Sequence, residues 1–211
     1  MKKHEKKEVQ EAELKAGIKD MSPLKKLEYF WMYDKWVIAL VIGIIVLAIG
    51  GYRWYEHSKI QEILSIAAVN SMVEDTESLE AEILEMVGTG GKYEEVAVYS
   101  NFSGNNETGE LEYYSQMTFV SHAAAGTLDV VLMPKSFAEK LDETGYFDSL
   151  EEVFGEDYDA VADYVSGNCL DLSETGLSEK FGMGDSIYVG VLGTSKHKEN
   201  VTKYILSILG K

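Results

Sequence analysis

Residues 128–155 read LDVVLMPKSFAEKLDETGYFDSLEEVFG, and this stretch decides the expected fold class. The short apolar run 128–133 predicts a buried strand that ends at Pro134. Residues 136–144 predict an amphipathic helix that ends at Gly145. A strand followed at once by a helix is typical of the βαβ units that build parallel sheets.

The same alternation continues on both sides of this stretch. Strands are expected at 95–100 and 186–192, and helices at 76–87, 111–125 and 196–209. Residues 63–70 favour a strand, with the end of a long helix from Tyr55 as the alternative. Together these elements predict an α/β fold: a single-lobe, mostly parallel, three-layer α/β/α domain with four to five strands.

A membrane span is predicted before this domain. Residues 36–52 contain no Asp, Glu, Lys, Arg or His, and at ~1.5 Å per residue they reach roughly 25 Å of a ~30 Å hydrocarbon layer. Aromatic side chains on both flanks favour the headgroup level and extend the span. We expect a juxtamembrane and transmembrane helix within 22–57 that acts as an uncleaved signal-anchor in the lipid bilayer, with a cleaved signal peptide as the alternative.

Charge divides the chain into two regions. Residues 1–55 carry ten Lys or Arg against seven Asp or Glu, whereas 56–211 carry nine against 29, a net charge of −20. The basic residues near the span lie mostly before it, which predicts a charged cytoplasmic segment at 1–21 and an extracellular domain at 58–211. Such an acidic domain repels phosphate backbones, so nucleic acid is excluded as its partner.

Motifs for catalysis, metals and cofactors are missing from the sequence. The run 88–92 lacks the glycine spacing and the Ser or Thr of a phosphate loop, and the four histidines form no metal-binding pair. The single cysteine, Cys169, is expected to be a small buried apolar residue. We therefore predict no catalytic residue, no metal ligand and no cofactor.

A binding site is expected where loops follow the carboxyl ends of parallel strands, because these loops meet at one edge of the sheet. Ordinary turn and helix-capping chemistry is the alternative role for the same residues. The candidate ligand- or partner-binding residues are Asn70, Ser71, Ser100, Asn101, Ser103, Lys135, Ser136, Thr194 and Ser195.

Residues 123–134, with Gly145-Tyr-Phe and the closing run 188–200, resemble the extracellular solute-binding proteins of bacterial ABC importers. The lead-in 26–36 is similar to small single-pass proteins of Gram-positive bacteria that carry such domains. The resemblance implies a periplasmic-binding-protein fold, in which two lobes close on a ligand. Here only residues 151–185 separate the third unit from the returning strand, too few for a second α/β lobe.

These features predict a non-enzymatic, membrane-anchored extracytoplasmic domain that binds a protein partner. One alternative is the substrate-binding subunit of an ABC importer, which would hold a small solute in a shallow site or complete a cleft as a homodimer. Another is a sensor or regulator that signals through the cytoplasmic segment.

Overall fold

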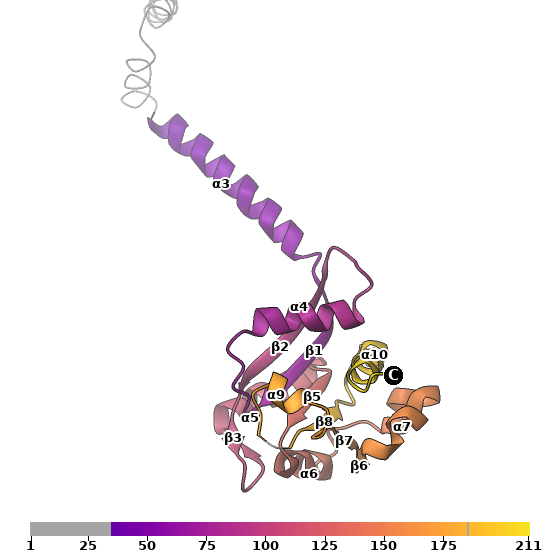
Figure 1. The fold of residues 1–211 in the computed structure, drawn as a ribbon. Coiled ribbons are helices and arrows are strands. Elements are labelled where there is room, and N and C mark those ends of the chain that lie inside the picture. Colours follow the sequence, from indigo (N-terminus) through magenta and orange to yellow (C-terminus); the bar gives the residue numbers. More distant parts are fainter. Residues whose placement is uncertain (1–34, 185) are drawn as a thin grey trace, which may run out of the picture. The chain divides into compact units, whose positions relative to one another are not determined.

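The computed structural model describes residues 35–184 and 186–211, which belong to two compact units, residues 1–59 and 60–211. The predicted cytoplasmic segment 1–21 and residues 22–34, the first part of the helix expected within 22–57, lie outside the described residues. The first unit contains helix α3 (Lys35–His57), and its part Ala39–His57 is long and apolar enough to cross a membrane (Figure 1). This helix is compatible with membrane anchoring. Because α3 ends at His57 and a strand begins at Gln61, the alternative of one long helix through residues 63–70 is wrong.

The second unit is built on a six-stranded mixed sheet with the order β2-β1-β5-β8-β7-β6. Strand β1 runs parallel to β2 and β5, whereas β8 is antiparallel to both β5 and β7, and β7 is antiparallel to β6. The strands are β1 (Gln61–Val69), β2 (Glu94–Phe102), β5 (Val130–Met133), β6 (Val165–Ser166), β7 (Cys169–Asp171) and β8 (Tyr188–Val191).

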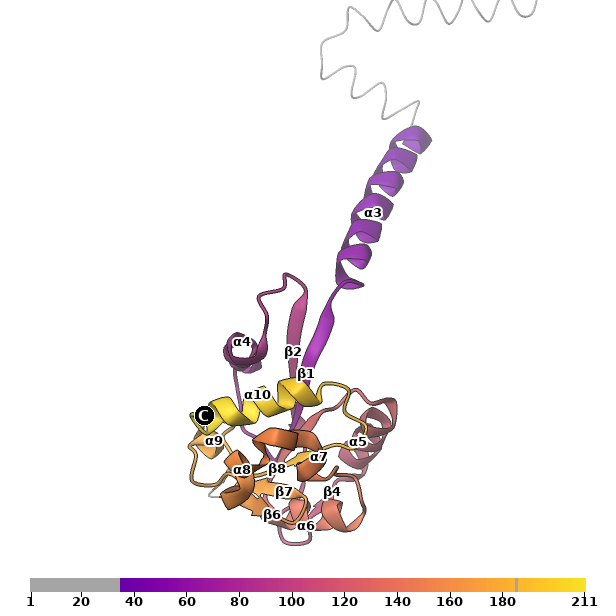
Figure 2. The same cartoon turned by 90° about the vertical axis from the view of Figure 1, so that its right-hand side faces the viewer.

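Helices cover both faces of this sheet (Figures 1 and 2). Along β1, Leu64, Ile66 and Ala68 face one core cluster while Ala67 and Val69 face the other, as the two-residue period of a strand requires. The first cluster is closed by α4 (Thr76–Val87), α7 (Leu150–Phe154), α9 (Leu177–Lys180) and α10 (Lys198–Ile208), and the second by α5 (Tyr113–Ala125) and α6 (Lys135–Glu143). The predicted α/β class and its three layers are confirmed.

Smaller elements complete the unit. A hairpin of β3 (Gly104–Asn105) and β4 (Glu110–Leu111) follows β2, where the turn-forming residues 101–109 predict only a long loop. The residue pattern of the insert after α7 predicts one helix over 157–165, but the insert contains η1 (Gly155–Asp157), α8 (Tyr158–Val161) and η2 (Ala162–Tyr164) instead. It then forms the β6–β7 hairpin, which raises the strand number to six instead of the expected four to five.

The direction of β8 differs from the expectation of a mostly parallel sheet, because β8 is antiparallel to both of its neighbours. Leu172 N–H donates to the Ile187 carbonyl at 3.0 Å, so the chain leaves β7 and enters β8 at the same end of the sheet. A parallel neighbour would need a crossover that returns the chain to the opposite end, and the four-residue α9 between β7 and β8 does not provide one. Strand β8 is therefore antiparallel, and the loop after it lies at the opposite edge from the loops after β1 and β5.

Candidate functional site

The predicted site residues do not all meet at one edge. Asn70, Ser71, Lys135 and Ser136 follow the parallel strands β1 and β5 at their carboxyl end. Thr194 and Ser195 follow the antiparallel β8, so their placement beside the others is wrong. Ser100 and Asn101 lie inside β2, which extends to Phe102, rather than in a loop after it. Ser103 begins the connection to the β3–β4 hairpin.

Asn70 anchors this hairpin to the end of β1. Its φ of 54° is the one left-handed conformation of a non-glycine residue in the described chain, and Asn tolerates this conformation. Its side-chain Nδ2 donates to the Gly104 carbonyl at 3.0 Å and to Asn106 Oδ1 at 2.5 Å, and its Oδ1 accepts from Gly104 N–H at 2.9 Å. Asn70 therefore holds the hairpin rather than presenting free hydrogen-bonding groups.

Ser71 and Ser103 also make turn and cap contacts. Ser71 Oγ accepts from Val73 N–H at 3.4 Å, a turn contact, and donates to the distant Phe181 carbonyl at 2.6 Å. Ser103 Oγ donates to Glu112 Oε2 at 3.1 Å, while its backbone N–H donates to Ser115 Oγ at 2.9 Å at the start of α5. Ordinary turn and capping chemistry thus accounts for these two residues.

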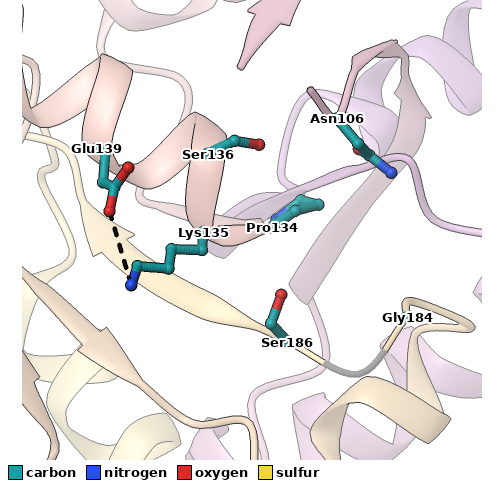
Figure 3. A pocket seen from close by; sticks show the side chains of 7 residues that line it. All are labelled: Asn106, Pro134, Lys135, Ser136, Glu139, Gly184 and Ser186. Atoms are coloured by element: carbon teal, nitrogen blue, oxygen red, sulfur yellow. Dashed lines mark ion pairs between the residues drawn. The ribbon is translucent and has the colours of Figure 1, made fainter. Parts of the chain in front are cut away.

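A pocket of about 640 Å³ opens at the same edge, between the tip of the hairpin, the first turn of α6 and the residues before β8. Figure 3 shows the Lys135 side chain extended toward Glu139, with 3.8 Å between Nζ and Oε1. Ser136 Oγ is buried and has no hydrogen-bond partner among the described residues. The lining residues are Asn106, Pro134, Lys135, Ser136, Glu139, Gly184 and Ser186.

A fixed carboxylate lies near this pocket. Asp171 accepts hydrogen bonds from Ser173 Oγ at 2.6 Å and from Tyr188 OH at 2.8 Å. Burial acts to raise the pKa of Asp171, but these hydrogen bonds and the charge of Lys135 outweigh it, so its pKa is lowered. Burial, followed by the bond to Asp171, raises the pKa of Tyr188 to about 12. The edge therefore carries a stable negative charge and a neutral tyrosine near the Lys135 cation, an arrangement suited to binding polar groups.

The opposite end of the sheet holds a polar cluster that the sequence did not indicate. Asp129, which is 1% exposed, precedes β5 and accepts from Ser65 N–H at 2.9 Å and from Ser65 Oγ at 3.0 Å. Ser195 Oγ donates to its other oxygen at 2.6 Å, and His197 Nδ1 lies 3.0 Å from Asp129 Oδ2. Thr194 Oγ1 nearby donates to the Ala123 carbonyl at the end of α5, at 2.7 Å.

This Asp129 cluster has the residue types of a catalytic triad but the wrong connections. In a triad the serine hydroxyl donates to the imidazole, which activates it. Here both Ser65 and Ser195 donate to the carboxylate instead. The cluster joins β1, the start of β5 and the segment before α10, so its role is to hold these elements together. Burial and the charge of Asp129 raise the pKa of Glu62, which lies beside the cluster.

Neither a metal-binding cluster nor a reactive thiol is found among the described residues. Within residues 35–184 and 186–211, no group of three His, Cys, Asp or Glu side chains is placed to hold a metal ion. Cys169 is buried, as expected, and its burial raises the thiol pKa to about 12. The thiol is therefore protonated near neutral pH and a poor nucleophile.

A sequence signal for the Asp129 cluster existed only in part. An Asp directly before a buried apolar strand indicates a paired carboxylate, because an unpaired buried charge is costly. Its partners Ser65, Ser195 and His197 lie more than 60 positions away and carried no such signal. No protein-family model matches the chain, and neither a curated protein nor a solved structure is significantly similar to it.

Proposed function

We propose that this protein is a non-enzymatic, single-pass membrane protein whose extracellular domain, residues 58–211, binds a protein partner. In this proposal residues 1–21 are cytoplasmic, and α3 (Lys35–His57) anchors the chain. The partner binds at the carboxyl edge of β1 and β5, which we call the strand edge and define by Asn106, Lys135, Ser136, Glu139 and Ser186. The pocket of about 640 Å³ at this edge is the observation that carries the proposal.

The proposal keeps the resemblance to one lobe of a solute-binding protein that the sequence motifs suggest. In this proposal the parallel strands β2, β1 and β5 correspond to the three units that the resemblance implies, and β8 corresponds to the returning strand. In two-lobed relatives the carboxyl edge faces the ligand cleft. Here residues 151–184 form short helices and the β6–β7 hairpin, so the described chain supplies no second lobe opposite the pocket.

An open edge of this kind suits a protein surface better than a small solute. A small ligand is normally buried over 70–90% or more of its surface, which requires walls on several sides. At the strand edge the side chains of Lys135 and Glu139 are 60% and 66% exposed. A protein partner can cover such residues and pair with both charges across a broader contact.

The charge of the domain restricts the partner further. Residues 58–211 carry nine Lys or Arg against 28 Asp or Glu, a net charge of −19. This differs by one from the −20 of residues 56–211 because Glu56 lies outside the shorter range. Long-range attraction therefore favours a cationic partner and slows the approach of an anionic one. We expect the binding surface of the partner to be basic or neutral.

One observation favours the importer subunit as a second candidate. The pocket volume of about 640 Å³ lies within the ~300–1,000 Å³ that small-ligand sites occupy. In that case a second chain would supply the missing wall and enclose a polar solute.

Photocrosslinking in native membranes tests the proposal. The full chain would carry a photoreactive side chain at Asn106 on the strand edge, or at the exposed Asp159 of α8 as the matched control. We expect a discrete protein adduct from position 106 only. Excess soluble domain should compete it away, whereas the Lys135→Glu domain should not. Equal adducts from both positions would refute the proposal, and binding of a small solute without any adduct would favour the importer subunit.

A further inference from the structure

Helix α5 (Tyr113–Ala125) differs in composition from the rest of the extracellular domain. Its sequence YYSQMTFVSHAAA contains no Asp, Glu, Lys or Arg. Every other helix in residues 60–184 and 186–211 contains at least one of these residues. In a domain so rich in carboxylates, an uncharged helix at the surface requires a separate explanation.

The outer face of α5 is apolar and exposed. Ser115, Phe119 and Ala123 are the buried residues through which the helix packs on the sheet. On the other side, Tyr113, Tyr114, Met117 and Val120 are 70%, 84%, 59% and 41% exposed. Large apolar side chains that cluster at an uncharged surface are typical of protein contacts.

A groove of about 360 Å³ runs beside this face, between α5, the β3–β4 hairpin and α6. Leu111, Phe119 and Tyr146 contribute apolar walls. Glu110 and Lys140 also line the groove and supply one charge of each sign. In a contact with two-fold symmetry, every pair of residues that touch across the interface occurs twice, once from each copy. Glu110 of each copy can therefore pair with Lys140 of the other.

We infer that the α5 face, defined by Tyr113, Tyr114, Met117, Val120 and the adjoining groove, binds a second copy of this chain. Two such acidic domains repel each other wherever their carboxylates approach within a Debye length of about 8 Å. Helix α5 itself brings no carboxylate into such a contact, and Glu110 of the groove can pair with Lys140 of the other copy. A cationic partner would instead find acidic side chains on α4 and α7.

The size of the face predicts a weak contact that depends on the membrane. Four exposed side chains and a short groove fall short of the roughly 800 Å² per partner that stable complexes bury. Chains confined to one membrane encounter each other at a raised effective concentration, which increases the fraction of dimer without any additional contact between the chains. We expect dimers in membranes and mostly monomers of the soluble domain at low concentration.

Cysteine crosslinking in native membranes tests this inference on the full chain. The native Cys169 is buried, so a cysteine introduced by Met117→Cys or Val120→Cys is the reactive thiol of the domain. Glu85→Cys, on the exposed face of α4, is the matched control. A bis-maleimide reagent should join two differently tagged copies through position 117 or 120 and not through position 85.

A second change separates a specific contact from chance collision. Adding Tyr114→Lys should lower the crosslinked fraction by about tenfold, because it buries an unpaired charge in the contact. Tyr114→Phe should leave the fraction unchanged. Equal dimer from position 85, no dimer from either 117 or 120, or an adduct of these positions with a different protein would overturn the inference. None of these substitutions changes a residue of the strand edge. A negative result here would therefore leave the proposed binding of a protein partner at the strand edge intact.

Discussion

The Asp129 cluster offers the sharpest test of how the fold is held together. The carboxylate is 1% exposed and lies within hydrogen-bonding distance of four polar atoms in Ser65, Ser195 and His197. Replacing Asp129 by Ala removes the acceptor and leaves these donors inside the protein. Replacing it by Asn keeps the shape and one oxygen, which can still accept from Ser65 N–H, while the new amide can donate to a reoriented Ser195 hydroxyl.

The two substitutions should therefore differ in cost. Each buried donor left without a partner costs about 1–3 kcal/mol, and the Ser65 backbone N–H cannot turn away. With a similar loss from Ser195, and a smaller one from the partly exposed His197, Asp129→Ala should lower the free energy of unfolding by about 4 kcal/mol. Asp129→Asn loses mainly the charge of the acceptor, so about 1–2 kcal/mol is expected.

Urea denaturation of residues 58–211, followed by far-ultraviolet circular dichroism, measures these losses. Asp159→Ala, at an exposed position of α8, is the control and should change stability by less than about 0.5 kcal/mol. A loss of about 4 kcal/mol is a large part of the total stability of about 5–15 kcal/mol, so a shifted midpoint will be evident. If Asp129→Ala matches the control, or if Asn costs as much as Ala, the reasoning about this cluster is refuted.

Three other changes probe separate features. Gly190→Ala should cost about 1–3 kcal/mol by denaturation, because an added Cβ would lie 2.6 Å from Phe147 Cζ, whereas Gly184→Ala, which meets nothing within 4 Å, should be neutral. Cys169, with its pKa raised to about 12, should react with a maleimide far more slowly in the folded chain than in urea; equal rates would contradict its burial. Burial, with the charge of Asp129, raises the pKa of Glu62 above 4.5, so its ionisation weakens the fold as pH rises through the folded pKa. Glu62→Gln should therefore raise the free energy of unfolding at pH 7 and lose this gain below the ordinary pKa of 4.5; a gain that stays the same at both pH values would contradict this.

Local sequence signals predicted the longer helices of the α/β domain, α4, α5, α6 and α10. The spacing of Leu79, Ile83 and Val87 places one face of α4 in the core, and the helix spans the predicted residues 76–87. Gly126, with φ 62°, ends α5 as expected. Both features depend on residues within a few positions of each other, so a single sequence contains the information they need.

Pairing between distant segments was harder to predict. Strands β6 and β7 have only two and three residues, too few for a pattern, and β7 is fixed by its antiparallel register with β8. The direction of β8 follows from where the chain turns at Leu172 and Ile187, which no local pattern encodes. For this reason Lys135 and Ser136 were placed correctly at the strand edge, while Thr194 and Ser195 were not.

Lysine labelling tests the central claim, that the strand edge is covered by a protein partner, most directly. Lys135 and Lys203 are matched: each lies on a helix four positions from a glutamate partner, with exposed fractions of 60% and 46%. An amine-reactive reagent should label Lys135 several-fold more slowly in native membranes than in the purified domain, while Lys203 should react equally in both. Equal labelling of Lys135 in the two settings would contradict the claim.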